Sequence, residues 1–581
     1  MIKGAFSEQK YERVNIDPIP EELVRLVDEV KNPDSAADMI ESYRKVDDWM
    51  QQLGTMYSMA YIRYTVNTAD EFYLGERDYY DRYLPAISEL SASMGAAIAS
   101  SPYRAEMAEL IGETAIKNME LSAKAISPEI IGDLQRENEF KTKYQTLTAS
   151  ARIDFDGKKL TLPQLVPYQE HTDRAVREAS FRAQGQYFAD NRDKLEGIFD
   201  ELVKVRTSMA RKLGFNTFTE MAYCRRVRNC YGPRDVEQFR EQVARDVVPL
   251  VSELLRLQYR RTDIGDPKIW DRPFEFKNGN PTPKGSPETI FENGKKMYSE
   301  LSPETGEFMS FMLEHGLFDV LSKENKANGG YCTDLPKLKA PFVFANFNGT
   351  KGDIEVLTHE CGHAFEGYIA SRMYELSAPQ EYTYDVAEIH SMSMEFFTYP
   401  WMGLFFESDA DKFYFAHLSG SLMFWPYGCM VDHFQHSIYD NPDWTAQQRN
   451  EEWLRLEKIY RPDVDFGGLP SYSEGTMWQR QLHIYLEPFY YIDYCMAQYV
   501  AVSYWKLMNL DRDAAWKSYF ELVKKAGTLN YIDLISQAGI ASPFGQNSVN
   551  EVAVAAYEYL LSIEKTVSEH DRDSEQQQTR G

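Results

Sequence analysis

The stretch "GDIEVLTHECGHAFEGYIA" at residues 352–370 contains two histidines, with a glutamate directly after the first. On a helix, His359 and His363 project from one face, because they are four residues apart. Two neutral imidazoles on a rigid face suit a zinc ion, and Glu360 would lie beside such an ion without binding it. Gly362 weakens a helix by about 1 kcal/mol relative to alanine, which predicts a close approach of another segment there. Short motifs of this kind also arise by chance, so the rest of the chain has to decide.

The composition predicts a large folded protein that binds neither nucleic acid nor membrane. Of 581 residues, 43% are hydrophobic and 14% aromatic, enough for an extensive core. The formal net charge of −26 disfavours contact with phosphate groups of nucleic acids or anionic lipids. No window approaches the roughly 18 apolar residues of a membrane span, and the first residues lack the apolar run of a secretory signal. Six scattered cysteines without a C-x-x-C pair then indicate reduced thiols and a cytoplasmic location.

The pattern of apolar residues predicts a mainly α-helical chain. Residues 1–200 form an expected N-terminal helical region, interrupted near 151–162 by a short hairpin that turns at Asp156-Gly157. Residues 201–565 form an expected second helical domain, which contains the histidine motif. The polar tail, residues 566–581, is expected to be disordered.

A small sheet and a loop are expected directly before the motif. Residues 328–350 are the one convincing strand-rich region of the sequence. Asp353 suits the N-cap of the motif helix, and Gly349 and Gly352 suit the preceding loop. The sequence thus places a sheet beside the candidate metal site.

A third metal ligand is expected from a second helix. In "YDVAEIHSMSMEFF", Glu388 and Glu395 are seven residues apart and therefore share a helix face. Glu388 follows His363 by 25 residues, which leaves room for a helix that returns beside the first. The surrounding apolar residues favour a buried role for these carboxylates over a solvated helix face. Glu388 is therefore the predicted third ligand, with a fourth position left for water.

These segments resemble a known family. "FANFNGTKGDIEVLTHECGHAFE", then "EIHSMSMEFF" and later "HIYLEPFYYIDY" look like the thimet oligopeptidase/oligoendopeptidase F family of zinc metallopeptidases, closest to its oligoendopeptidase F and Pz-peptidase branch. The motif-bearing similarity runs from about residue 330 to residue 500. It implies a mainly α zincin-type fold in which two helical halves enclose a deep catalytic channel, with residues 201–565 as the catalytic domain. Glu366 stands where many relatives carry His or Gln, which affects substrate detail and not the ligand set.

The resemblance implies a zinc-dependent endopeptidase that cleaves short unstructured peptides. One Zn²⁺ per chain would be held by His359, His363 and Glu388. Glu360 would act as the general base that accepts a proton from the attacking water. Glu395 would orient a ligating imidazole by a hydrogen bond, while Asp385 is a rival for that role and plain solvation of the helix face is a third reading.

Relatives use histidine and tyrosine side chains from segment 483–499 to hold the substrate and its transition state. His483, Tyr490 and Tyr494 are accordingly the expected catalytic donors, and Tyr491 is expected to contact the substrate. Tyr490 and Tyr494 share a helix face, because they are four residues apart. Core packing is the ordinary role of such a cluster, and the sequence leaves open which tyrosine acts.

Peptide binding is expected at the strand before the motif. Residues 340–349 read as an edge strand that pairs with an extended substrate through Ala345, Asn346, Phe347 and Gly349. Such main-chain pairing predicts broad sequence tolerance, and the Pz-peptidase likeness leaves open whether collagen-derived peptides are favoured. Residues 461–476 either close over the peptide as a mobile loop or serve as an ordinary connector.

The remaining candidates are assigned structural roles. Cys361 is expected to face away from the metal as a packed thiol. His433 and His436 lack the carboxylate and histidine that would complete a site. His390 and His417 are likewise expected to be structural.

Two other functions stay open at this point. A zinc carboxypeptidase or dipeptidase of related fold would share the chemistry, but it needs a charged group to hold a free peptide terminus. A non-catalytic helical binding protein with an accidental motif would bind no stoichiometric zinc. The spacing of Glu388 and the His/Tyr segment argue against the binding protein. The oligomeric state and the preferred cleavage site are not indicated by any pattern in the chain.

Overall fold

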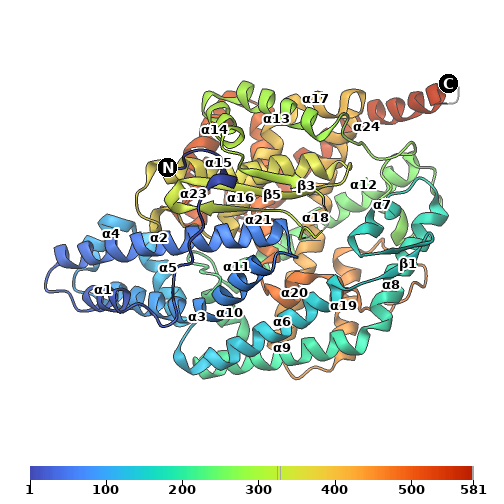
Figure 1. Cartoon of the computed structure of the whole chain (residues 1–581). Coiled ribbons are helices and arrows are strands. Elements are labelled where there is room, and N and C mark those ends of the chain that lie inside the picture. Colours follow the sequence, from blue (N-terminus) through green and yellow to red (C-terminus); the bar gives the residue numbers. More distant parts are fainter. Residues whose placement is uncertain (324, 328, 579–581) are drawn as a thin grey trace.

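A small sheet with the motif helix packed on it lies at the centre of the molecule (Figure 1). The computed structural model describes residues 1–323, 325–327 and 329–578. The strand order is β3-β5-β4, with β5 parallel to β3 and antiparallel to β4. The bounds are Phe318–Leu321 for β3, Tyr331–Leu335 for β4 and Ala340–Phe347 for β5. The predicted fold class, mainly helical with a small sheet beside the motif, is confirmed.

The prediction that residues 340–349 form an edge strand is wrong. β5 is the central strand, because β3 pairs with one side of it and β4 with the other. β3 comes from the segment "FDVL", which has no alternating pattern long enough to predict a strand. The edge nearest the motif helix is therefore β4, which packs against α15 (Gly352–Met373).

The N-terminal helices have a hydrophobic core of their own. This core is built mainly from residues between Ile16 and Ile116, whereas most buried hydrophobic residues from Ile130 onward belong to the main core. The helices are α1 (Glu21–Lys31), α2 (Ala36–Val66), α3 (Glu71–Ser100), α4 (Arg104–Ile111) and α5 (Glu113–Lys124). The cores thus divide well before residue 200, and the domain boundary proposed there stays a prediction.

The middle of the chain adds further helices around the main core. The predicted hairpin is present as β1 (Ile153–Phe155) and β2 (Lys158–Leu160), and positive φ angles at Asp156 and Gly157 form its turn. The helices are α6 (Ile131–Ala149), α7 (Val166–Gln169), α8 (Arg174–Asp190), α9 (Arg192–Lys212), α10 (Phe218–Arg225), α11 (Pro233–Gln242), α12 (Val248–Arg261), α13 (Pro287–Leu301) and α14 (Pro303–Glu314).

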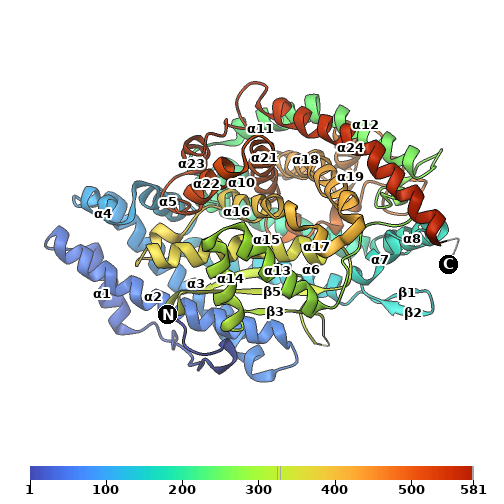
Figure 2. The same ribbon diagram turned by 90° about the horizontal axis from the view of Figure 1, so that it is seen from above.

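The C-terminal helices stack in layers behind the sheet. Seen from above, the order runs from β5 through α15 and α16 to α21 and α18, and then to α24 (Figure 2). The helices are α16 (Tyr384–Phe397), α17 (Gly403–Phe406), α18 (Ala410–Asp440), α19 (Ala446–Tyr460), α20 (Leu482–Leu486), α21 (Tyr491–Met508), α22 (Arg512–Val523), α23 (Tyr531–Gln537) and α24 (Ser548–Gln578). No helix in the described ranges is long and apolar enough to cross a membrane.

The last helix, α24, continues to Gln578, within residues 566–581, whose disorder stays a prediction. Asp571 connects this helix to the rest of the chain. Its carboxylate lies 2.9 Å from the buried ammonium group of Lys412 and accepts a hydrogen bond from the backbone amide of Lys277 at 2.7 Å. No local pattern in the sequence reveals these long-range contacts.

Candidate active site

Gly362 allows the motif helix and α16 to approach closely. A Cβ atom at this position would lie 2.5 Å from the carbonyl oxygen of His390 and 2.6 Å from the Cα of Ser391. Only a glycine fits such a backbone contact. The close approach predicted at Gly362 is confirmed, and it sets the distance between the two helices that carry the candidate ligands.

The start of α15 differs from the expectation. Asp353 is not its N-cap, since the helix already begins at Gly352. Its carboxylate instead accepts hydrogen bonds from the amides of Asn348 and Gly349, both at 2.8 Å. Asp353 therefore fixes the loop between β5 and the motif helix.

The structure brings His359, His363 and Glu388 together. One candidate ligand atom from each of them lies within 4.8 Å of the others. The Glu388 Oε2 atom is 3.3 Å from His359 Nε2 and 3.6 Å from His363 Nε2. Burial acts to raise the pKa of Glu388, but the two imidazoles outweigh it and hold the pKa well below its usual value. A buried, ionised carboxylate therefore faces two imidazole nitrogens.

Glu395 connects the candidate ligands to a second histidine. His359 Nδ1 lies 2.7 Å from Glu395 Oε1, and His417 Nε2 lies 2.5 Å from Glu395 Oε2. Against the effect of burial, the two carboxylates, Glu388 and Glu395, raise the pKa of His359 well above its usual value, and Nε2 of the ring faces Glu388. Tyr399 donates in turn to His417 Nδ1 at 2.7 Å. Asp385, the rival candidate, contacts Thr383 and Tyr231 instead.

Glu360 is buried without a hydrogen-bond partner. Its side chain is 8% exposed, and Oε2 has no partner among the described residues. Burial raises the pKa of Glu360, against the opposing effect of the two nearby imidazoles. An orphaned carboxylate is costly in a protein interior. The carboxylate of Glu360 lies beside the two histidines, in a position that suits a proton acceptor.

Segment 483–499 lies over the same centre. The Tyr490 hydroxyl donates to Glu388 Oε1 at 2.8 Å, and the rings of Tyr490 and Tyr494 are 4.8 Å apart. His483 lies in the short helix α20, with its ring 5.0 Å from that of Tyr491. Burial, assisted by the Arg226 charge, lowers the pKa of His483 to about 4, so the ring is neutral at ordinary pH. All four side chains predicted in this segment therefore gather around the centre.

Two cavities flank the candidate site. One has a volume of about 520 Å³ and is lined by His359, Glu360, His483, Tyr491 and Tyr494, among others. The other has a volume of about 710 Å³ and lies between the N-terminal helices and the end of β4. Its lining includes Tyr384 and Arg226, which contact the ring of Tyr490 from the far side, at 4.8 Å each. Open space therefore exists on both sides of the histidine and glutamate cluster.

The residues of β5 that were expected to bind peptide are otherwise engaged. Ala345 and Phe347 are 1% and 8% exposed, so both belong to the core. The Asn346 amide donates to the carbonyl oxygens of Ala327 and Gly329, and Gly349 donates to Asp353. Because both sides of β5 are paired, no substrate strand can add to it.

The strand that passes closest to Glu360 is β4. A Cβ atom at Gly330, directly before β4, would lie 3.4 Å from Glu360 Oε1. α2 contacts β4 through side chains: the hydroxyl groups of Ser58 and Thr333 are 3.3 Å apart, and those of Thr65 and Tyr331 are 2.6 Å apart. The outer edge of β4 has no strand partner in the part of the chain that the structure describes.

The other histidine and cysteine candidates are not part of the predicted ligand group His359, His363 and Glu388. Cys361 is fully buried. His433 bonds to Tyr460 and His436 to Tyr223, and neither belongs to a metal-binding group among the described residues. His390 is buried, and burial lowers its pKa to about 3. All six cysteines are free thiols.

Sequence reasoning missed several residues of the site. His417 was given a structural role, yet it contacts Glu395 and lines the smaller cavity. Tyr384 and Arg226 were not singled out. The arginine-rich run "CRRVRN" was the available signal for Arg226, since a buried arginine needs partners.

Comparison with known proteins agrees with this geometry. The pattern described as "Peptidase M3 N-terminal domain" matches residues 6–126, and "Peptidase family M3" matches residues 167–553. Oligopeptidase PepF of Bacillus subtilis (strain 168) is 22% identical over 540 residues, which cover 88% of this chain and 78% of that protein.

Solved structures are similar over almost the whole chain. An oligoendopeptidase F and Pz peptidase A with an inhibitor both give a TM-score of 0.92, at 43% and 42% identity, and each match covers 96% of this chain and 99% of the other. An oligoendopeptidase F from Bacillus anthracis str. Ames is 39% identical, with a TM-score of 0.88 over 97% of this chain and 99% of that one. The chain belongs to peptidase family M3 and is a metallopeptidase of the oligopeptidase kind.

Proposed function

We propose that this protein is a zinc-dependent endopeptidase that binds one Zn²⁺ per chain and cleaves internal bonds of short, unstructured peptides. The observation that carries the proposal is the convergence of His359, His363 and Glu388 beside the orphaned carboxylate of Glu360. A histidine pair with one carboxylate is a donor set of catalytic zinc sites, which keep a further position open.

The donor set fits zinc in its position. Glu395 contacts Nδ1 of His359, so Nε2, which faces Glu388, is the nitrogen that this ring would offer to a metal ion. Tyr490 and Ser391 donate to the two oxygens of Glu388, at 2.8 and 3.0 Å, and so fix its orientation. When bound here, zinc would supply Lewis acidity towards a water molecule and the carbonyl of the scissile bond.

Glu360 is the proposed general base. Its buried carboxylate would take a proton from the attacking water and pass it to the leaving amine. Because burial raises its pKa, the carboxylate is a better proton acceptor than an exposed glutamate. The lack of any competing partner for Oε2 leaves that oxygen free for the water.

Tyr490, Tyr494 and His483 are the proposed donors to the oxyanion that forms at the scissile carbonyl. Burial and the nearby Glu388 carboxylate raise the pKa of both tyrosines, so their hydroxyl protons are retained. A protonated hydroxyl group can stabilise developing negative charge, and Tyr490 would exchange its hydrogen bond to Glu388 for one to the oxyanion. Tyr491 lines the same cavity and is proposed to contact the substrate.

The free edge of β4 replaces β5 as the proposed peptide-binding strand. An extended peptide that pairs with β4 would pass Gly330, where the absence of a side chain leaves room next to Glu360. Cavities on both sides of the metal cluster favour cleavage within a chain over removal of a single terminal residue. This arrangement supports the endopeptidase over the carboxypeptidase or dipeptidase alternative.

The similarity to Pz peptidase A and the oligoendopeptidases supports short peptides as the substrate class. We include collagen-derived peptides among the substrates to be tested. The free state of all six cysteines is compatible with the cytoplasmic location proposed from the sequence.

The Glu360→Gln variant tests the proposal. Turnover of a peptide blocked at both ends should fall by about 100- to 10,000-fold, the usual contribution of a general base. Zinc content, measured by elemental analysis of the purified protein, should stay at one ion per chain. Normal turnover by this variant would exclude Glu360 as the base, and a wild-type protein without zinc would exclude the metal site.

A further inference from the structure

A cavity lined by three arginines lies next to the candidate active site. Its volume is about 180 Å³, and its charged lining residues are Arg272, Arg461 and Arg480. No carboxylate belongs to the lining, although the chain as a whole has a net charge of −26. Arg272 and Arg461 are half-buried and Arg480 is exposed at the cavity, and such a concentration of positive charge in a partly enclosed space attracts an anion.

Among the described residues, only Arg461 of the three arginines has an anionic partner. Arg461 Nε donates to Glu457 Oε2 at 2.7 Å. Arg272 and Arg480 have no carboxylate within ion-pair distance in the described ranges, and Arg480 contacts only the tyrosine hydroxyls of Tyr427 and Tyr472. Burial, together with the neighbouring Arg461, lowers the pKa of Arg272 to about 10, so its charge persists at neutral pH.

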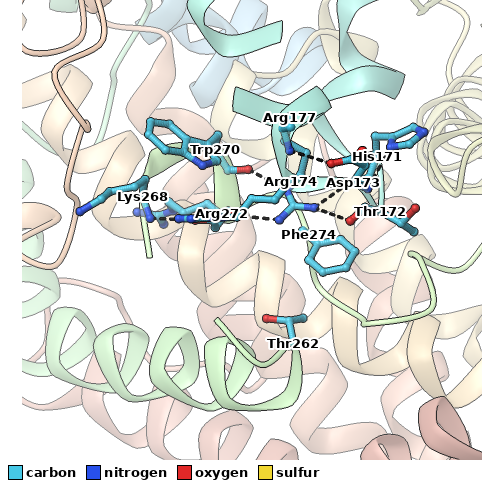
Figure 3. A network of polar contacts seen from close by, with 12 residues as sticks. His171, Thr172, Asp173, Arg174, Arg177, Thr262, Lys268, Trp270, Arg272 and Phe274 are labelled. Carbon is cyan, nitrogen blue, oxygen red and sulfur yellow. Dashed lines mark hydrogen bonds and ion pairs between the residues drawn. The ribbon is translucent and has the colours of Figure 1, made fainter. Parts of the chain in front are cut away.

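The backbone at Arg272 is held in place by the surrounding structure. Arg177 donates to Asp271 Oδ1 at 2.9 Å and to the carbonyl oxygen of Trp270 at 3.2 Å, which fixes the turn directly before Arg272 (Figure 3). The Gln258 amide donates to the carbonyl oxygen of Arg272 itself at 2.8 Å. A fixed backbone at Arg272 limits the conformational freedom that is lost when its side chain binds a carboxylate.

A thin layer of side chains separates this cavity from the active-site cavity. The ring of Tyr427 is 5.9 Å from that of Tyr491, which lines the active-site cavity. The Tyr427 hydroxyl donates to Gln481 Oε1 at 3.0 Å, and the Gln481 amide lies 2.8 Å from His483 Nδ1. The two cavities are therefore neighbours, separated by the side chains of Tyr427 and Tyr491.

The segment that was weighed as a mobile loop contributes to this cavity. Leu469 and Ser471 are fully buried, and the Ser471 hydroxyl donates to the carbonyl oxygen of Gly185 in α8 at 3.0 Å. Tyr472 lines the cavity and donates to the Gln184 side chain at 2.6 Å. Residues 461–476 thus pack as one wall of the cavity.

We propose that this cavity binds the C-terminal carboxylate of the substrate peptide through Arg272 and Arg480. A planar carboxylate matches the paired N–H groups of a guanidinium, and the apolar walls formed by Phe181, Trp453 and Met477 suit the last side chain of the peptide. The inference rests on the proposed peptidase function. If the C-terminal carboxylate binds in this cavity, the spacing between the cavity and the cleavage site fixes the distance from the cleaved bond to the end of the peptide. The enzyme is then restricted to short substrates.

Paired substrates test the proposal. Two fluorogenic peptides of one sequence, both blocked at the N-terminus, end in a free acid or in an amide. Wild-type kcat/KM should favour the acid by about 10-fold or more, as expected for a charge-assisted hydrogen bond. The ratio should approach unity in Arg272→Gln and in Arg480→Gln. Because acid and amide are compared within one preparation, the ratio does not depend on the fraction of folded protein.

Arg182→Gln is the matched control, because Arg182 lies on the same α8 as Phe181 but is 50% exposed and paired with Glu178. Its ratio should equal that of the wild type. Equal cleavage of acid and amide by the wild type, or a ratio unchanged in both cavity variants, would overturn the proposal while the peptidase function stands. A peptide that ends in an amidated glutamate provides a further test. If its kcat/KM equals that of the free-acid peptide, the cavity binds a side-chain carboxylate and the proposal is overturned. Absence of any cleavage would instead refute the proposed function itself.

Discussion

Replacing Gly362 with alanine should separate the two helices that carry the metal cluster. The new Cβ would lie 2.5 Å from the His390 carbonyl oxygen, and ordinary contacts begin near 3.4 Å, so the helices must move apart by about 0.9 Å. Metal ligands tolerate displacements of only about 0.2 Å. Glu388 lies on the displaced helix, half a turn from His390, whereas His359 and His363 lie on the other. We therefore expect zinc affinity to fall by about 10-fold or more.

The same change should destabilise the fold. Overpacking of this kind costs about 1–3 kcal/mol, whereas alanine in place of glycine gains at most about 1 kcal/mol of helix propensity. Gly197→Ala in α9 is the control, since no atom lies within 4 Å of its added Cβ; that variant should be slightly stabilised and bind zinc normally. Competition with a chelator measures the affinity, and thermal unfolding measures the stability. Wild-type zinc affinity in Gly362→Ala would refute the argument that this contact sets the geometry of the site.

Three further predictions concern individual side chains. Tyr490→Phe removes the hydrogen bond to Glu388 and a proposed oxyanion donor, so kcat/KM should fall by about 10- to 1,000-fold with zinc retained; an unchanged kcat/KM would contradict this role. Glu395→Gln weakens the acceptor of the His359 proton, and zinc affinity measured against a chelator should drop by about 10- to 100-fold, whereas equal affinity would make Glu395 dispensable. Burial lowers the pKa of His436 from 6.5 to about 4, so the unfolded chain binds one more proton between these values. Stability should therefore decline as the pH falls through that window, by about 1.4 kcal/mol per pH unit for this residue; urea unfolding of His436→Gln should show a shallower slope, and an identical slope would mean that His436 does not titrate in this way.

Local spacing predicted the metal cluster better than the substrate strand. His359 and His363 are neighbours on one helix turn, and the apolar surroundings of Glu388 indicated its burial, so helical periodicity sufficed. Strand order is different, because it depends on which segments pair in three dimensions. β3 has only four residues and pairs in parallel with β5, so nothing local showed that β5 was the central strand.

Long-range contacts account for the other differences. His417 reaches Glu395 only because α18 crosses behind α16, and a histidine in an apolar helix has no local sign of such a partner. The arginine cavity likewise combines Arg272 with residues nearly 200 positions later in the chain, Arg461 and Arg480. The residue types were visible in the sequence, but their convergence was not.

The contact between Asp571 and Lys412 has a consequence for synthesis of the chain. The ammonium group of Lys412 is almost completely buried, and its nearest carboxylate is translated 159 residues later. Until that part of α24 has been synthesised, the ammonium group of Lys412 has Asp409, at 3.7 Å, as its nearest carboxylate. The burial of Lys412 with both carboxylates therefore has to wait until α24 has been made and has folded onto this region.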